Sequence, residues 1–316
     1  MPQSPLVIDC DTGRDDALSI WMALALKRDL AAVIASYGNT TLDNVCENCV
    51  RVLALAGRED IPVWCGEDSP STNHHGVAAV IQPRQQVSGN GLCNLELPAS
   101  SQVALPMNAT QRAEALRLIA RGKGAVDYII LGPVTNFAAT LAMLGDEASK
   151  VIVRVTIMGG KMDALWDAMP GADFNLACDP FVVNATLEGA AYHGIPVRFV
   201  PMNVTWPIVL DISQLEALST QTAIGRTAKD LMIAHARYFA TEPVFRFHDP
   251  CVIVALSHET HFRHTKVRVV AAESSTDFGR LIEDQQGAPA ALFEADEALR
   301  TQLLSEILYL LSMRQD

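Results

Sequence analysis

Short apolar runs alternate with longer amphipathic segments along the whole chain of 316 residues. The runs are typical of buried strands, and the segments between them have the period of helices. Such alternation predicts an α/β fold, an open and mostly parallel sheet with helices on both faces. We expect strands at 6–8, 32–36, 128–131, 151–157, 197–200 and 267–271. We expect helices at 15–26, 42–56, 135–144, 179–193, 224–239, 250–257 and 297–311.

The chain has no linker rich in proline, glycine or serine, so we expect a single domain over residues 1–316. Two stretches, 65–110 and 158–176, lack a regular period and are expected to be loops. In this fold class, long loops surround the ligand site beyond the carboxyl ends of the strands. The longest apolar runs are too short to cross a bilayer, and the N-terminal segment lacks the basic start of a secretory signal. We therefore expect a cytoplasmic protein without a membrane partner.

The formal net charge of −12 bears on the partners of the chain. A protein that binds duplex nucleic acid needs a basic surface that displaces phosphate counterions, and the sequence indicates none. An acidic site also repels phosphorylated substrates unless a cation intervenes. The composition therefore favours neutral small molecules as substrates.

Seven cysteines are scattered through apolar stretches, and their odd number is typical of a reducing compartment. Cys46 and Cys49 form a C-x-x-C pair inside a helical pattern, and no second pair lies at zinc-finger spacing. We interpret them as two thiols on a helix face, in preference to a metal or redox site.

Four carboxylates follow the first predicted strand within eight residues: Asp9, Asp11, Asp15 and Asp16. Acids so close together repel one another unless a cation lies among them or several of their pKa values rise. Hard divalent cations prefer oxygen ligands, so Ca²⁺ or Mg²⁺ is the natural partner. Alternatively, Asp15 and Asp16 open a helix, where carboxylates cap free N–H groups. Because that alternative does not account for Asp9 and Asp11, we favour a metal-binding or catalytic role.

Two protein families place acids in this way. The haloacid-dehalogenase-like phosphatases have an apolar strand followed by D-x-D-x-T/V, which D-C-D-T matches locally. The nucleoside hydrolases have the longer motif D-T-D-P-G-x-D-D-A, and residues 9–17 read D-C-D-T-G-R-D-D-A. All four acids, the glycine and the alanine are retained, whereas Cys10 and Thr12 depart from the motif.

The rest of the chain resembles the nucleoside hydrolases in block after block, in the family's own order. G-N-T-T-L and I-P-V-W-C-G resemble the family's G-N-x-T-L and I-P-V-x-x-G, and L-G-P-V-T-N-F-A resembles its L-G-P-L-T-N-x-A. M-G-G, P-G-A-D-F-N-L-A-C-D-P and F-H-D-P resemble its M-G-G, P-x-x-E-F-N-x-x-x-D-P and V-H-D-P. The chain is thus identified as a member of the inosine-uridine preferring nucleoside hydrolases, which use water to cut the bond between ribose and base.

The resemblance implies a Ca²⁺ at the bottom of the pocket, bound to ribose hydroxyls and to the attacking water. Its expected ligands in this chain are Asp11, Asp16, Asp249 and the backbone carbonyl of Leu131. Ca²⁺ suits such a site because it accepts roughly six to eight oxygen ligands, sugar hydroxyls and water included. Asp11 is also expected to be the general base. The other carboxylates would stabilise the positive charge that builds on the sugar.

The resemblance also implies contacts with the nucleoside. Asp15 is expected to bind the 2′-hydroxyl, with Asn39 nearby on the ribose and Asp249 serving both the sugar and the cation. His248 is the candidate acid, or hydrogen-bond donor, for the departing base. Purine-specific members have Trp at this position, so the chain resembles the broader or pyrimidine-preferring branch. Family members are usually dimers or tetramers, and we expect a homo-oligomer.

Three departures from the family pattern lie on the outer side of the expected site. The family's H-G-x-D-G-L-G becomes S-G-N-G-L-C at residues 88–93, so its His and Asp are absent. The Glu that contacts the ribose 5′-hydroxyl becomes the shorter Asp173, and the Asn six positions earlier aligns with Asp167. Met158 and Asn175 are retained, and we expect all four side chains at the substrate site. Metal and water chemistry is expected to be intact, whereas recognition of the 5′ end and the base differs.

Simpler explanations remain open for several residues. Asp249 and Asp179 each precede a proline and a helix-like run, an ordinary helix start, and we keep Asp179 as a cap. Asn39 follows a glycine and fits a turn. Two other functions also remain open: a phosphatase with Asp9 as its nucleophile, and a catalytically weak nucleoside- or ribose-binding protein, suggested by the altered outer loop.

Overall fold

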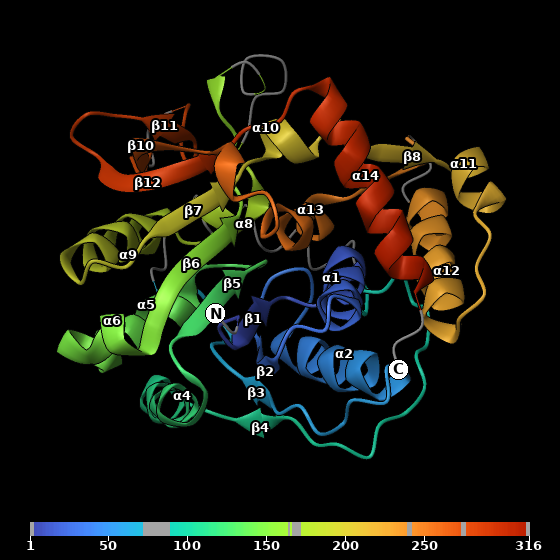
Figure 1. Ribbon diagram of the computed structural model, residues 1–316, viewed down its shortest axis with the longest axis horizontal. Helices are drawn as coiled ribbons and strands as arrows, with labels where there is room; N and C mark the ends of the chain where they lie inside the picture. The colour runs from blue at the N-terminus through green and yellow to red at the C-terminus, as the bar shows by residue number, and fades with distance from the viewer. Residues whose placement is uncertain are drawn as a thin grey trace.

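The computed structural model describes residues 3–71, 89–163, 165, 172–238, 242–272 and 276–313. Within these residues, ten strands form one sheet in the order β11-β10-β12-β7-β6-β5-β1-β2-β3-β4, and β8 pairs with β9 in a second, two-stranded sheet. Figure 1 shows the large sheet running through the molecule with helices on both sides.

Parallel strands make up the centre of the large sheet. Their bounds are β1 Leu6–Cys10, β2 Leu30–Ala35, β5 Val126–Ile130, β6 Ile152–Met158 and β7 Val197–Val200. The chain leaves β1 in one direction through β2 and later returns to the other side of β1 with β5. Such a reversal of strand order opens a crevice beyond the carboxyl ends of the two flanking strands, where open α/β sheets bind ligands.

The edges of the sheet differ from the expectation in two ways. On one side it continues through β3, Val63–Cys65, and β4, Leu105–Pro106, two short strands that the sequence did not indicate. On the other side β12, Ala288–Phe293, runs parallel to β7, while β10, Phe262–Val269, is antiparallel to both β12 and β11, Leu281–Glu283. The sheet is therefore mostly parallel, as predicted, with an antiparallel edge.

Two helical layers bury the faces of the sheet. One layer packs against Leu6, Ile8 and Cys10 of β1, and Figure 1 shows it on the side of the C-terminus. It consists of α1 Arg14–Ala25, α2 Leu42–Leu55, α12 Ala223–Tyr238, α13 His248–Ala255 and α14 Glu297–Ser312. The other layer covers Val7 and the opposite face. It consists of α4 Ala109–Lys123, α5 Thr135–Leu144, α6 Ala148–Val151 and α9 Pro180–Tyr192.

Several short elements connect these layers. They are α8 Phe174–Ala177, α10 Met202–Thr205, β8 Val209–Asp211, α11 Ile212–Ala217, β9 Val244–Arg246, and the 3₁₀ turns Gly145–Glu147 and Glu259–His261. The longer α4 was not predicted, because only Arg112, Ala113 and Leu116 of its side chains are buried. Its apolar stripe is too narrow to produce a clear helical period.

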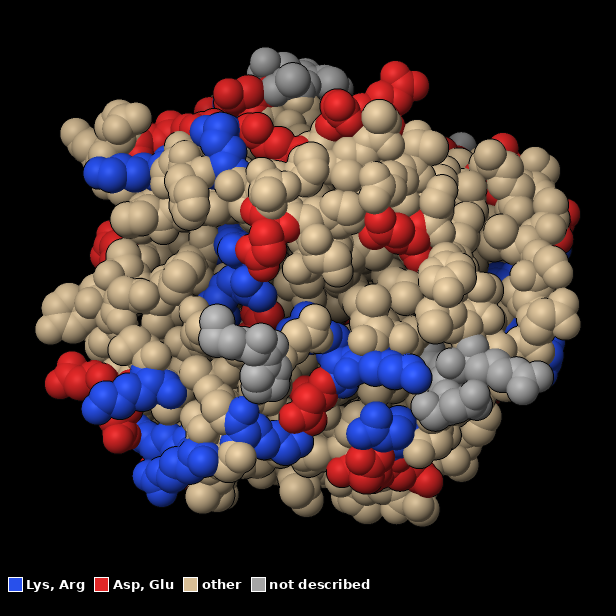
Figure 2. All heavy atoms as spheres, viewed as in Figure 1, with Lys and Arg blue, Asp and Glu red and all other residues tan. Residues whose placement is uncertain are grey.

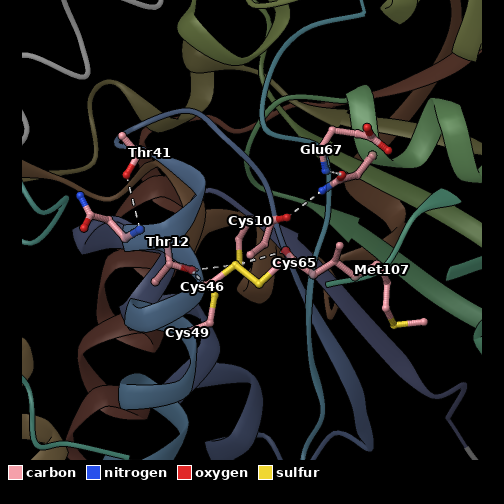
Figure 3. Close-up of a disulfide and its surroundings, with 12 residues drawn as sticks. Cys10, Thr12, Thr41, Cys46, Cys49, Cys65, Glu67 and Met107 are labelled. Carbon is pink, nitrogen blue, oxygen red and sulfur yellow. Dashed lines mark hydrogen bonds between the residues drawn. A yellow bond between two sulfur atoms is a disulfide. The ribbon is translucent and has the colours of Figure 1, made fainter. Parts of the chain in front are cut away.

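A disulfide corrects the interpretation of the C-x-x-C pair. Cys46 of α2 is bonded to Cys65 of β3, with 5.9 Å between their Cα atoms, whereas Cys49 is a buried thiol. The prediction of two helix-face thiols is therefore wrong for Cys46, whose partner lies on a neighbouring strand. Figure 3 shows Cys49, Thr12 and Cys10 beside the disulfide. The Thr12 hydroxyl lies 2.9 Å from the Cys49 sulfur and 3.2 Å from the Cys10 sulfur, so both departures from the first motif belong to one buried chain of contacts.

Charged groups of both signs share the surface. On the face drawn in Figure 2, Lys and Arg side chains lie next to Asp and Glu side chains. Ion pairs such as Arg154–Glu259 and Arg117–Glu147 are formed with 2.8 and 2.7 Å between charged atoms. Within the described residues, no helix is both long and apolar enough to cross a membrane.

Candidate functional site

A cavity of about 510 Å³ opens beyond the carboxyl ends of the central strands. This size falls within the usual range for small-molecule sites. Its wall is assembled from the segments that follow β1, β2, β5, β6 and β7, together with the start of α13. The lining residues are Asp11, Asp15, Asn39, Leu131, Met158, Ala172, Asp173, Phe174, Asn175, Met202, Trp206, His248 and Asp249.

Asp11 is held by the loop that follows β2. The backbone N–H of Asn39 donates a 2.6 Å hydrogen bond to Oδ2 of Asp11, and the Asn39 side chain reaches the Asp11 backbone oxygen at 3.4 Å. Gly38 provides the space for this contact, because a Cβ at that position would lie 2.1 Å from Oδ2. Asn39 is therefore more than a turn residue, since it lines the cavity and fixes the orientation of the Asp11 carboxylate.

Asp15, Asp16 and Asp249 form a group of acids at the cavity. One carboxylate oxygen from each lies within 4.8 Å of the others. Burial, followed by the charges of Asp11 and Asp15, raises the pKa of Asp16 well above its usual range. Oδ2 of Asp16 accepts a hydrogen bond from the backbone N–H of Gly13, whereas its buried Oδ1 has no hydrogen-bond partner. Converging hard oxygens, one of them buried without a partner, suit a divalent cation.

Three acids were also candidates for capping a helix, and the structure gives a different answer for each. Asp16 does close the first turn of α1 through Gly13, so its helix-start role is real. Asp249 is not a cap, because α13 already begins at His248 and has Phe247 as its N-cap residue. Asp179 occupies the N-cap position of α9, but its carboxylate accepts a hydrogen bond from the backbone N–H of Ser71.

Leu131 brings a backbone carbonyl to the same cavity. Its N–H donates to the Asp9 carbonyl at 2.8 Å, which continues the pairing of β5 with β1. Its own carbonyl oxygen accepts a 2.5 Å hydrogen bond from the side-chain amide of Asn175, which also donates to the Met158 carbonyl at 3.2 Å. A carbonyl oxygen has two lone pairs, so this contact still permits a second partner.

Asp9 lies outside the cavity wall. Because side chains alternate along a strand, Asp9 shares the face of Val7 and points into the layer of α5. Its carboxylate accepts hydrogen bonds from the Tyr128 hydroxyl at 2.8 Å and from the Asn136 amide at 2.9 Å. Burial raises its pKa to about 7. A buried carboxylate held in this way cannot act as the phosphatase nucleophile that the alternative requires.

Asp173 lines the outer part of the cavity and is also the N-cap of α8. Its oxygens accept hydrogen bonds from the backbone N–H groups of Gly160 at 2.8 Å and Leu176 at 3.2 Å. Only 4% of its surface is exposed, and burial raises its pKa to about 6. The Asp173 carboxylate therefore faces the cavity and not the bulk solvent. Asp167, the other acid expected here, lies outside the described residues.

His248 lies among side chains that no sequence motif indicated. The Thr205 hydroxyl lies 2.8 Å from Nδ1 of His248, and the rings of Trp206 and His248 are 6.0 Å apart. The Arg246 guanidinium lies 4.0 Å from the centre of the Trp206 ring. One signal would have indicated Trp206: it follows β7 closely, on the side of the sheet where ligands bind.

The described residues of the altered outer loop, 89–93, are not among those that line the cavity. Arg14 donates to the Gly91 carbonyl at 3.4 Å, and Asn48 donates to the carbonyls of Thr12 and Asn90 at 2.9 and 2.8 Å. Residues 89–93 thus pack on the loop that carries the first motif. Ser88 lies outside the described residues.

Comparisons with known proteins agree on one family. A family model described as inosine-uridine preferring nucleoside hydrolase matches residues 6–302. The chain is 31% identical over 270 residues to the pyrimidine-specific ribonucleoside hydrolase RihA of Shewanella sp. (strain MR-4), covering 82% of this chain and 79% of that protein. It is 30% identical over 262 residues to the RihA protein of Escherichia coli O127:H6, covering 80% and 79%.

Solved structures support the fold. A plant nucleoside hydrolase has a TM-score of 0.81 at 21% identity, covering 98% of this chain and 99% of its own. A purine-preferring ribonucleoside hydrolase from Gardnerella vaginalis has a TM-score of 0.76 at 21% identity, with the same coverage. The predicted fold class is confirmed. The phosphatase alternative is overturned, because the chain belongs to the inosine-uridine preferring nucleoside hydrolase family and is an N-glycosyl hydrolase of ribonucleosides.

Proposed function

We propose that this enzyme is a Ca²⁺-dependent ribonucleosidase that prefers pyrimidine nucleosides. One observation supports the dependence on a metal ion. Carboxylate oxygens of Asp15, Asp16 and Asp249 lie within 4.8 Å of one another, beside a cavity that Asp11 also lines. The names of the RihA proteins that the chain resembles support the pyrimidine preference. So does His248, where the family resemblance implies Trp in purine-specific members.

Asp11, Asp16, Asp249 and the Leu131 carbonyl would hold the ion, and Asp15 lies close enough to join them. All are oxygen donors, which match a hard cation, and Ca²⁺ tolerates a ligand set of mixed geometry better than Mg²⁺ does. When bound, the cation lowers the pKa of a water ligand and neutralises part of the acidic charge.

Asp11 is proposed as the general base. The Asn39 N–H fixes its carboxylate through Oδ2, so its orientation is set before the substrate enters. A carboxylate of ordinary basicity removes a proton from water only if that water is already acidified, which the cation would provide. The surrounding acids then stabilise the positive charge that develops on the ribose as the bond to the base breaks.

The remaining cavity residues are proposed to orient the substrate. Asp15 and Asn39 flank Asp11, where they would accept and donate hydrogen bonds to the ribose hydroxyls. Asp173 is proposed to accept from the 5′-hydroxyl, with Asn175 and Met158 beside it and with Asp167 as a further contact. His248 is proposed as the donor to the departing base. Remote sugar contacts of this kind favour the transition state because they align the reacting centre.

Two further expectations stay predictions. The assembly of the chain into a homo-oligomer, a dimer or tetramer, is one of them. The location in the cytoplasm likewise stays a prediction.

Release of free ribose tests the proposed function directly. We would assay uridine, cytidine, inosine and adenosine after chelation and after return of Ca²⁺, Mg²⁺ or Mn²⁺. The proposal expects turnover to be lost on chelation, restored best by Ca²⁺, and highest for uridine and cytidine. Turnover that resists chelation would overturn the metal dependence, and faster cleavage of both purine nucleosides would overturn the base preference.

A further inference from the structure

The contact between Thr205 and His248 joins two segments that are 43 residues apart in sequence. Thr205 ends the short helix α10 after β7, and His248 begins α13. The Thr205 side chain is fully buried, and its hydroxyl lies 2.8 Å from Nδ1 of the imidazole. Hydroxyls in helices often bond a carbonyl of the preceding turn, so a contact with a histidine on another helix is a tertiary feature.

A second set of contacts holds the histidine from another side. The Trp206 ring is inclined by 38° to the imidazole at 6.0 Å. The Arg246 guanidinium lies 4.0 Å above the Trp206 ring and is paired with Glu242, which limits the movement of the indole. The ring of His248 is thus oriented by Thr205 and Trp206, which follow β7, and Arg246 at the end of β9 supports the indole.

The hydroxyl also bears on which nitrogen carries the proton. A neutral imidazole has one donor nitrogen and one acceptor nitrogen, and the partner of one nitrogen decides the state of the other. If the Thr205 O–H donates to Nδ1, the hydrogen of the ring is on Nε2. The ring then presents an N–H donor on the side away from Thr205.

We propose that Thr205 is a positioning residue for the leaving group: its hydroxyl donates to Nδ1 of His248, so that Nε2 is the N–H donor directed at the departing base. This inference rests on the proposed function, in which His248 serves the base. As the bond from C1′ to the base nitrogen breaks, its electron pair stays on the base, and the Nε2–H donates a hydrogen bond to the atom that gains charge. The base then takes its proton from water. A donor aimed at developing charge lowers the barrier more than it strengthens binding of the substrate.

The test compares two leaving groups in the same active site. Uracil is a poor leaving group that needs a hydrogen-bond donor, whereas 4-nitrophenolate, released from 4-nitrophenyl β-ribofuranoside, departs with little assistance. Thr205→Val keeps the shape of the side chain and removes the hydroxyl, and Thr205→Ser restores the hydroxyl. We expect Thr205→Val to lower kcat for uridine by about 10-fold or more with little change in KM, and to lower kcat for the nitrophenyl riboside by less than about 2-fold. Thr205→Ser should recover most of the uridine rate.

Two further measurements separate positioning from a merely structural role. In a double-mutant cycle, Thr205→Val should have no further effect once His248 is Ala, because the two residues act through one contact. Nitrogen-15 spectra should show Nε2–H as the main form of His248 in the wild type and a mixture in Thr205→Val. Equal losses for both substrates, or an additive loss in the cycle, would overturn the proposal.

His248→Ala keeps this inference separate from the proposed function. If His248→Ala loses uridine turnover and Thr205→Val does not, only the role of Thr205 is overturned. If His248→Ala retains full uridine turnover, the role of His248 in the proposed function is overturned as well.

Discussion

The backbone N–H of Asn39 donates a 2.6 Å hydrogen bond to Oδ2 of Asp11, so the loop after β2 orients the carboxylate that follows β1. The two strands are parallel neighbours, with Cys10 beside Ala35 at their carboxyl ends. Because the contact uses a backbone group, substitution of the Asn39 side chain would not remove it. The contact depends instead on the free space beside Gly38, which a larger residue would fill.

Gly38→Ala should therefore inactivate the enzyme without unfolding it. The new Cβ would lie 2.1 Å from Oδ2 of Asp11, so the carboxylate must move. We expect the uridine turnover rate to fall by ~100-fold, the usual cost of one misplaced catalytic group. Gly57→Ala is the matched control, because Gly57 also has a positive φ, of 67°, and an added Cβ there meets nothing within 4 Å. A Gly38→Ala enzyme with normal kcat would contradict the role given to this contact.

Ca²⁺ should stabilise the folded protein. Asp15, Asp16 and Asp249 converge, and their mutual repulsion falls when a cation binds. A cation at 100 times its Kd adds about 2.7 kcal/mol to the free energy of unfolding. Differential scanning fluorimetry should show a higher Tm with Ca²⁺ than after chelation.

Asp249→Asn should weaken Ca²⁺ binding in a calorimetric titration and remove most of this rise in Tm. Asp43→Asn is the control, since Asp43 is an exposed acid in the first turn of α2 and lies outside the group. An equal effect of Ca²⁺ on the Tm of wild type and Asp249→Asn would rule out the proposed ligand.

The pH dependence of kcat/KM should report Asp173. Its pKa is raised to about 6, mainly by burial, and only the ionised form is a full acceptor for the 5′-hydroxyl. As pH rises through about 6 the carboxylate loses its proton, so kcat/KM for uridine should rise over that interval. Asp173→Asn should remove this inflection from the profile. The same inflection in the variant would assign it to another group.

Nucleotides should be far poorer substrates than nucleosides. A 5′-phosphate would meet the Asp173 carboxylate and be repelled. Asp173→Ala should lower kcat as well as affinity for uridine, because the sugar is then less well oriented. This change also removes the N-cap of α8, so Asp296→Ala, which removes the N-cap of α14, is the control for a lost cap. Equal cleavage of uridine and its 5′-monophosphate would contradict this account of the outer cavity.

Much of the fold was predictable because its strands are buried and its helices amphipathic. Period and composition indicated β1, α1, α5 and α14 to within a few residues. They did not indicate β3 and β4, which are too short to show a period, or β12, which follows a turn at the sheet edge. The disulfide was not predictable either, because C-x-x-C spacing says nothing about a partner on another strand.

The candidate site was predictable where its residues lie in motifs, and not where it depends on distant contacts. Asp11 and Asp249 are far apart in sequence but line one cavity, as the resemblance implied. Strand alternation could not separate the roles of Asp9 and Asp11, because residues two apart share a face. They differ because Asp9 lies inside β1, where it bonds Tyr128, whereas Asp11 follows the end of the strand. The contact of Thr205 with His248 joins two helices and leaves no local pattern.

The central claim is tested most directly by ribose release from uridine, measured for the wild type and for Asp11→Asn in the same Ca²⁺ buffer. The amide keeps the size of the side chain but cannot accept the proton of the attacking water, and it is a poorer ligand for Ca²⁺. The account predicts equal amounts of ribose and uracil from the wild type, and a rate at least ~100-fold lower for Asp11→Asn with uridine binding partly retained. No ribose release from the wild type, or a near-normal kcat in Asp11→Asn, would contradict it.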